Sequence, residues 1–568
     1  MSLQSHHRRL ALFSLRPLNE RAKQVVSHPW NQHLASKLTD GTIVLDVGFH
    51  IRSRSHRTIA TLGRGDADIF VEGTSIAKVQ CSFEIETSTN VIMLYDRSHG
   101  QTTQVFGDNA TKFEHGRPRR VVVQKKLNTG LGMGGKEQDL VQFELLWHQD
   151  PTETAERIKD REDITSDYEE NPRLARTIDE LATVLPSQRQ TRIHTPGPRQ
   201  LTMRYTKVAT LGSGQFGVVY KAIDIDTGRF LAVKILQRPH RASKEAEWRQ
   251  SLYYALKREV ETLSHICHPH IIDYITSQGW DGPSVEIFMG LKDGTLRSLV
   301  LKGGFSSLTS LAHYVFHQML QALDYLAAKG IVHRDVKPEN ILYSSLPSAQ
   351  YQFQLGDFGL CNSTVSAVTS VGSPLYMAPE AFQNQVQTHK MDVWSLFVTM
   401  AWTLDVDGFR ESSEQFKCLQ HAHQAILVAA SKIEVIQEMA RVDPDERASA
   451  AQMLVKCFDG IGLTTHRSRV PPMIPLKPST RTNADTYMGS TAQVTRRPIQ
   501  GIQRPRRQVR DPFRIRKSNN PWARKLRQDI IAATPQPNIL STKRPGVPCK
   551  AESSELVQGF RLRSRTQD

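Results

Sequence analysis

The segment His333-Arg-Asp-Val-Lys-Pro-Glu-Asn340 decides how this 568-residue chain is interpreted. It places a carboxylate, a lysine and an asparagine within one short polar stretch that follows a helical pattern. Asp335 can accept a proton from an incoming hydroxyl group, Lys337 can neutralise phosphoryl oxygens, and Asn340 can hold a metal ion. Its fixed positions recur by chance in only about one of several thousand chains of this length. The segment therefore predicts chemistry and not only structure.

Residues on both sides of this segment complete the same chemistry. Downstream lies Asp357-Phe-Gly359, whose carboxylate is a hard oxygen ligand suited to Mg²⁺. Upstream, Leu211–Val219 carries glycines in the spacing GxGxxG, which lets backbone N–H groups approach phosphate oxygens. Lys234 follows on an expected third strand of the same sheet, and Glu259 in an amphipathic helical run is expected to orient it toward the phosphates.

In their residues and their order, these motifs resemble those of the eukaryotic protein kinases, and Ala378-Pro-Glu380 closes the set. The resemblance covers residues 204–460 and implies a two-lobed α+β domain that binds ATP and Mg²⁺. It implies a serine/threonine kinase, because Lys337 is typical of that class. The catalytic residues would be Asp335, Lys337, Asn340, Lys234 and Glu259, and the metal ligands would be Asn340 and Asp357. The nucleotide contacts would be Leu211, Gly212, Ser213, Gly214, Gln215, Phe216, Gly217, Val219, Ala232, Lys234, Met289, Leu291 and Leu342.

The same resemblance implies two supporting features, and the residues themselves suggest a third. Asp392 is expected to brace the catalytic loop, and Glu380 is expected to form a buried pair with Arg447. An arginine beside the catalytic base, Arg334, also favours a nearby anion, which a phosphate on the following loop would supply. Candidate sites for that phosphate are Thr369 and Ser370.

The stretch from residue 41 to residue 148 contains short β-branched and apolar runs broken by turn residues, which predicts an all-β sandwich. Leu62-Gly-Arg64, Ile76–Phe83 and Asp96–Gly100 resemble, in order, the motifs of the forkhead-associated (FHA) domain. That family grips phosphothreonine, and the resemblance implies Arg64 and Lys78 as the phosphopeptide contacts.

This FHA-like pattern is degenerate at three positions. Ala77 stands where the family has serine, Gln80 where it has histidine, and His99 where it has asparagine. The missing serine hydroxyl removes a direct phosphate donor. A purely structural sandwich and a working phosphopeptide reader therefore remain alternatives.

The remaining segments are expected to be an N-terminal arm over residues 1–40, a linker over 149–203 and a disordered tail over 461–568. The tail holds 22 Lys and Arg against 6 Asp and Glu, so it carries the whole net charge of +16. Its basic clusters are typical of a nuclear-import signal or of a surface that binds nucleic acid. No run approaches the roughly 18 apolar residues of a membrane span, which predicts a nuclear or cytoplasmic protein without membrane association.

An FHA-like domain before a kinase domain resembles the DNA-damage and meiotic checkpoint kinases, which implies protein substrates and phosphothreonine partners. The alternative is a pseudokinase scaffold that binds phosphopeptides or nucleic acid. That alternative requires the loss of a catalytic residue, whereas Lys234, Asp335 and Asp357 are all present.

Overall fold

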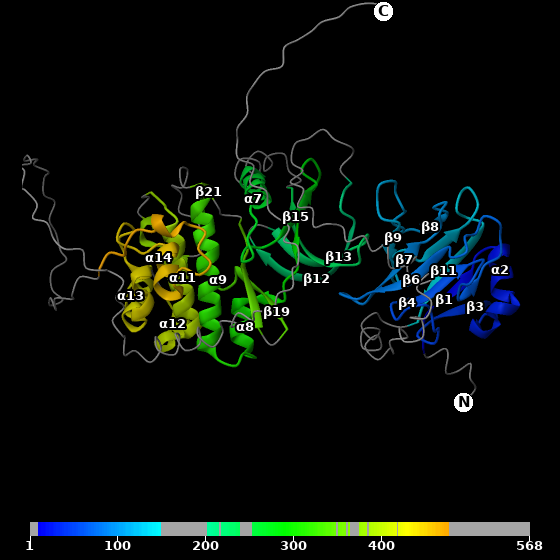
Figure 1. Ribbon diagram of the computed structural model, residues 1–568, viewed down its shortest axis with the longest axis horizontal. Coiled ribbons are helices and arrows are strands. Elements are labelled where there is room, and N and C mark those ends of the chain that lie inside the picture. Colours follow the sequence, from blue (N-terminus) through cyan, green and yellow to red (C-terminus); the bar gives the residue numbers. More distant parts are fainter. Residues whose placement is uncertain are drawn as a thin grey trace, which may run out of the picture. The chain divides into compact units, whose positions relative to one another are not determined.

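The computed structural model describes residues 10–148, 201–214, 217–238, 253–347, 350–358, 362–363, 374–382, 386–416 and 419–475. Figure 1 shows the course of these segments, with the N-terminal β-region in blue and the helical region in green to orange. Residues 149–200 of the candidate linker lie outside the described residues, as does the chain from residue 476 onward.

Two β-sheets build the N-terminal region. One is six-stranded, in the order β2-β3-β1-β11-β10-β8, and the other is five-stranded, in the order β5-β4-β6-β7-β9. The strands of the first sheet are β1 (Ala11–Pro17), β2 (Ala35–Lys37), β3 (Ile43–Gly48), β8 (Thr103–Phe106), β10 (Gly130–Met133) and β11 (Val141–Trp147). Those of the second sheet are β4 (Thr58–Gly63), β5 (Ile69–Phe70), β6 (Cys81–Glu86), β7 (Val91–Asp96) and β9 (Arg120–Val122).

The two sheets enclose a single hydrophobic core. Phe13 and Phe143 from the first sheet and Phe83 from the second belong to one cluster of buried side chains. The rings of Phe13 and Phe83 meet edge to face, with 4.9 Å between their centroids. Helix α2 (Glu20–Ser27) adds Val25 and Val26 to the same core.

The start of the sandwich differs from the sequence prediction. The sequence predicts a mobile arm over residues 1–40, whereas β1 is an inner strand of the six-stranded sheet and pairs with both β3 and β11. Its residues Ala11–Leu15 are buried without alternation. Because α2 contributes to the core and packs against β1, the strand lacks the alternating polar residues that mark a half-exposed strand.

The second region begins with an antiparallel sheet in the order β12-β13-β14-β16-β15. Its strands are β12 (Tyr205–Gly214), β13 (Gly217–Asp224), β14 (Phe230–Gln237), β15 (Tyr274–Gln278) and β16 (Ser284–Gly290), and helix α7 (Tyr254–Ser264) packs beside β15. Leu256 and Val260 of α7 share a core with Val285 and Ile287 of β16. This layer is the N-lobe.

Helices dominate the rest of the described chain, the C-lobe. They are α8 (Leu296–Lys302), α9 (Leu308–Ala328), α10 (Pro379–Phe382), α11 (Lys390–Leu404), α12 (Phe409–Ser413), α13 (Leu419–Lys432) and α14 (Ala450–Phe458). Short 3₁₀ turns are η3 (Pro374–Tyr376), η4 (Val406–Gly408), η5 (Glu434–Ala440) and η6 (Arg467–Arg469). Helix α9 packs against α11 and α14, and α11 is buried along nearly its whole length. None of the described helices is both long enough and apolar enough to cross a membrane.

Residues 461–475 differ from the expected tail. The backbone N–H groups of Thr464 and Thr465 donate to Asp324 Oδ2 at 2.8 and 2.9 Å, and the Thr465 hydroxyl donates to Asp324 Oδ1 at 2.6 Å. Asp324 lies on α9 and is only 1% exposed. Arg441 Nη2 donates to the carbonyl of Ile474 at 2.7 Å. The segment therefore supplies the hydrogen bonds that a buried carboxylate requires.

We expect a stop codon after residue 475 to leave the melting temperature of the second region unchanged and one after residue 460 to lower it. In the shorter chain Asp324 loses three of its hydrogen-bond donors. A buried charge left without its partners lowers the free energy of unfolding by about 3–5 kcal/mol. A domain of this size loses roughly 2–4 °C per kcal/mol. Differential scanning calorimetry of the two truncations measures the difference. Equal melting temperatures would show that residues 461–475 do not stabilise the C-lobe.

Candidate active site

The catalytic-loop segment lies between β18 (Ile331–Val332) and β19 (Ile341–Leu346). Its backbone is held by Asp392 of α11, whose Oδ2 and Oδ1 accept the N–H groups of His333 and Arg334, both at 2.8 Å. Arg334 has φ +73°, an unfavourable conformation for a residue with a Cβ. Two hydrogen bonds to one carboxylate offset that strain, so the predicted bracing by Asp392 is confirmed.

Asp392 is a buried acid with an unusual titration. Burial raises its pKa to about 7, although the two backbone N–H groups and the charge of Arg334 act in the opposite direction. Its oxygens therefore depend on donors within the protein. This dependence ties the position of α11 to that of the loop.

Asp335 lies at the centre of the site. Its Oδ2 accepts hydrogen bonds from Lys337 Nζ at 2.7 Å and from Asn340 Nδ2 at 2.8 Å. Asn340 Nδ2 also donates to the Asp335 carbonyl at 2.8 Å. Lys337 and Asn340 thus both contact Asp335, and these two hydrogen bonds fix the orientation of the Asp335 carboxylate.

Lys234 and Asp357 form the second part of the site. Lys234 on β14 is only 7% exposed, and its Nζ donates to Asp357 Oδ1 at 3.0 Å. Partial desolvation raises the pKa of Asp357, but the charge and hydrogen bond of Lys234, with His333 and Lys337, outweigh it and leave the pKa below its ordinary value. The carboxylate is therefore ionised at neutral pH.

Contacts through the backbone join these two parts. The N–H of Gly356 donates to the carbonyl of Asn340 at 2.8 Å, and His333 Nε2 lies 3.0 Å from the carbonyl of Gly356. The ring of Phe358 packs edge to face on His333, with 4.7 Å between centroids. Asp357 is consequently positioned by the segment that carries Asp335.

The described part of the glycine-rich segment ends β12 at Gly214 and begins β13 at Gly217. Gly217 has φ +108°, and a Cβ there would lie 2.4 Å from the carbonyl oxygen of Ile235. Only glycine fits that position. Val219 pairs with Lys234, and Ala232 pairs with Met289, so these predicted nucleotide contacts lie on neighbouring strands of one sheet.

The other predicted nucleotide contacts are distributed around this sheet. Leu211, Gly212, Ser213 and Gly214 end β12, Leu291 follows β16, and Leu342 lies on β19. Gln215 and Phe216 lie outside the described residues, as do Thr369 and Ser370. Glu259 lies in α7, but its side chain is also outside the described part.

The donor set fits Mg²⁺ and phosphate. Asp357 supplies ionised oxygens, and Asn340 directs its amide nitrogen at Asp335, which leaves the amide oxygen as its ligand atom. In the described part of the chain, no group of three or more His, Cys, Asp or Glu residues could hold a metal. Two protein oxygens match Mg²⁺, which usually takes one or two protein ligands and completes its shell with phosphate and water.

Two further side-chain contacts support the site. Gln387, which the sequence gives no reason to select, accepts a hydrogen bond from Arg334 Nη2 at 2.8 Å. Arg447 donates to both oxygens of Glu380 at 2.6 and 2.9 Å, and both side chains are buried, which confirms the predicted pair. This pair connects α10 to the segment before α14.

In the sandwich, Arg64 and Lys78 lie on adjacent loops and are exposed. The N–H of Arg64 donates to the carbonyl of Ala77 at 3.0 Å, which joins the two loops. Gln80 is fully buried and accepts the N–H of Ala77 at 2.9 Å, while its amide donates to Thr103 at 2.9 Å. Gln80 thus has a structural role that its place in the degenerate motif does not suggest.

Comparison with known proteins identifies the second region. Residues 205–458 match the protein kinase domain family. The chain is 31% identical over 256 residues to the serine/threonine-protein kinase dkf-1 of Caenorhabditis elegans, covering 43% of this chain and 35% of that protein. It is 29% identical over 280 residues to the serine/threonine-protein kinase DCLK1 of Rattus norvegicus, covering 45% of this chain and 60% of that protein. Less than two thirds of either relative is matched. Residues 205–458 therefore form a protein kinase domain that is homologous to those of serine/threonine kinases.

Proposed function

We propose that this protein transfers the γ-phosphoryl group of MgATP to serine and threonine hydroxyl groups of other proteins. The observation that carries the proposal is the set of contacts from Lys234 to Asp357 and from Lys337 and Asn340 to Asp335. Lys234, Asp335, Lys337 and Asp357 carry charges of the kind that phosphoryl transfer uses, and hydrogen bonds join them in two pairs.

The roles follow from charge and position. Asp335 accepts the proton of the attacking hydroxyl group, and Lys337 stabilises the negative charge that spreads over the phosphoryl oxygens. Lys234 binds the α- and β-phosphates, a role in which we expect Glu259 to orient it. Asn340 and Asp357 would hold Mg²⁺, which would supply positive charge to neutralise the phosphate oxygens. Glycine at the start of β13, Gly217, would let backbone N–H groups come close to the phosphates.

The pseudokinase alternative has less support. A pseudokinase would bind its partners without transferring phosphate, because it has lost a catalytic residue. Here Lys234, Asp335 and Asp357 are present, and each has a charged or polar contact within the site. A role for the sandwich in checkpoint signalling, and for the tail in nuclear import or nucleic-acid binding, extends this proposal beyond the kinase domain.

The Asp335→Asn variant tests catalysis. Because asparagine cannot accept the hydroxyl proton, turnover should fall about 10²- to 10⁴-fold while the affinity for MgATP stays nearly the same. Steady-state phosphorylation of a generic protein substrate, with ATP binding measured separately, gives both quantities. The control is Asp407→Asn, at a side chain that is 66% exposed and pairs with Lys432. Wild-type turnover in Asp335→Asn would disprove the proposed role.

The Asp357→Asn variant tests metal and nucleotide binding. Loss of an ionised oxygen should weaken MgATP binding about tenfold or more and raise the Mg²⁺ concentration needed for half-maximal activity. Isothermal titration with ATP, in Mg²⁺ and then in EDTA, measures the effect. If the variant and the wild type bind MgATP equally, Asp357 is not a ligand.

We also propose that the sandwich binds phosphothreonine weakly through Arg64 and Lys78. Both cations are exposed, and their loops are joined by a backbone hydrogen bond. Without a serine hydroxyl at Ala77, one charge-assisted bond is missing, which is worth about 1.5–3 kcal/mol, or roughly ten- to a hundredfold in affinity.

Fluorescence anisotropy of the full chain with labelled phosphothreonine peptides tests this pocket. Ala77→Ser should tighten binding, and Arg64→Ala should abolish it, whereas the unphosphorylated peptide serves as the control. Binding that does not depend on Arg64 would place the pocket elsewhere. An absence of binding in both wild type and Ala77→Ser would leave the sandwich a structural role.

A further inference from the structure

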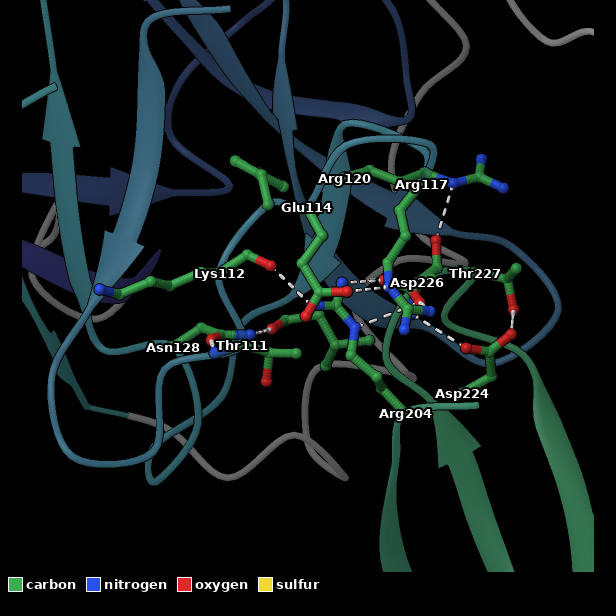
Figure 2. Close-up of polar contacts among 12 residues, drawn as sticks. Thr111, Lys112, Glu114, Arg117, Arg120, Asn128, Arg204, Asp224, Asp226 and Thr227 are labelled. Atoms are coloured by element: carbon green, nitrogen blue, oxygen red, sulfur yellow. Dashed lines mark hydrogen bonds and ion pairs between the residues drawn. The ribbon is translucent and has the colours of Figure 1, made fainter. Parts of the chain in front are cut away.

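We propose that the sandwich and the kinase N-lobe share a specific interface, built on Asp226, that couples the sandwich to the strands carrying the nucleotide-binding residues. The interface lies at the turn Ile225–Gly228 between β13 and β14. Figure 2 shows this turn beside three side chains of the sandwich, Glu114 and Arg117 from the loop before β9 and Arg120 from the start of β9.

The first component is a shared ion cluster. The Asp226 carboxylate accepts a hydrogen bond of 3.1 Å from Arg117 Nη1 of the sandwich and also forms an ion pair with Arg204 of the N-lobe. Glu114 lies 2.7 Å from Arg117 and 3.7 Å from Arg204, so two cations face two anions. The side chains of Arg117 and Asp226 are only 8% and 11% exposed. Such a partly dehydrated, neutral cluster is sensitive to the loss of any one member.

The second component is the open edge of a sheet. Strand β9 is the last strand of the five-stranded sheet, and its Val122 N–H donates to the carbonyl of Ile225 at 2.9 Å. Arg120 Nε donates to the carbonyl of Asp226 at 2.9 Å. The kinase turn therefore occupies donors of an edge strand, which proteins otherwise have to protect.

The third component is apolar. Ile225 is 5% exposed and belongs to the core cluster of the sandwich, although it lies in the kinase turn. Ile223 of β13 joins Val91, Met93 and Val122 in a separate cluster. Gly228 has φ +72°, and a Cβ there would lie 2.7 Å from the sulfur of Met93. Close backbone approach and side-chain burial thus accompany the charged contacts.

The turn continues directly into the strands of the nucleotide site. Strand β13 runs from Gly217 to Asp224, and β14 carries Lys234 opposite Val219. A hairpin fixed at Ile225–Gly228 has less freedom at its other end, where β13 begins at Gly217. We therefore infer that losing the interface weakens MgATP binding. This second step rests on the proposed function, whereas the interface itself does not.

Hydrogen exchange of the full chain tests the interface without any need for catalysis. Asp226→Ala should raise the exchange rate in the segment with Val122 about tenfold, because its acceptor at Ile225 is no longer held. The matched control is Asp281→Ala, at an exposed residue in the turn between β15 and β16 of the same lobe. Unchanged exchange in residues 81–86 shows that the sandwich stays folded. If Asp226→Ala also exposes residues 81–86, Arg117→Ala, which breaks the contact from the sandwich side, decides the case.

The dissociation constant for MgATP, measured by titration calorimetry on the same variants, tests the coupling. We expect it to rise about two- to thirtyfold in Asp226→Ala and Arg117→Ala but not in Asp281→Ala. Exchange equal to that of the wild type in both interface variants would overturn the interface. Raised exchange with an unchanged dissociation constant would overturn the coupling alone. A wild-type protein that binds no MgATP would count against the proposed function instead.

Discussion

The kinase site depends on one buried carboxylate. Asp392 accepts the N–H groups of both His333 and Arg334, and the second of these residues has a left-handed backbone. Without those two acceptors the strained turn has no compensation, and Asp335, the next residue, loses its fixed direction. Lys337, Asn340 and, through Gly356, Asp357 take their positions from the same turn. A residue that touches no reacting group thus sets the geometry of those that do.

The same arrangement recurs at other points of the chain, where a buried acid receives donors from a distant segment. Asp324 takes three hydrogen bonds from residues 464 and 465, and Glu380 takes two from Arg447. Asp226 receives Arg117 across the boundary with the sandwich. A buried carboxylate without donors would lower the stability of the fold. Each of these acids therefore makes the segments that it joins depend on one another.

The sequence predicted the part of the site that is compact along the chain. The catalytic loop carries Asp335, Lys337 and Asn340 within six residues, so the sequence predicts their joint role without any knowledge of tertiary contacts. The bracing role of Asp392 and the Glu380 pair came from family resemblance, not from spacing.

Other predictions failed where the sequence carries no local signal. The prediction of a mobile arm over residues 1–40 was wrong for β1, because a strand buried on both faces has no alternation of polar and apolar residues to identify it. The tail boundary was wrong for residues 461–475, because a basic, proline-rich sequence gives no sign of the distant Asp324 that orders it. Asp226 sits in Asp-Ile-Asp-Thr-Gly, a pattern typical of an exposed turn, and nothing local identifies its partner.

The pairing of β1 with β11 has a consequence for biosynthesis. These neighbours are the first and last strands of the sandwich, with Phe13 opposite Trp147. The six-stranded sheet cannot close until the final strand has left the ribosome, about 7–26 s after the first at roughly 5–20 residues per second. Ile225 completes the same core only after a further stretch of translation. During that interval β1 is an apolar strand that lacks one of its two partners, so the nascent chain is most exposed to aggregation and chaperone capture before the kinase domain has begun to fold.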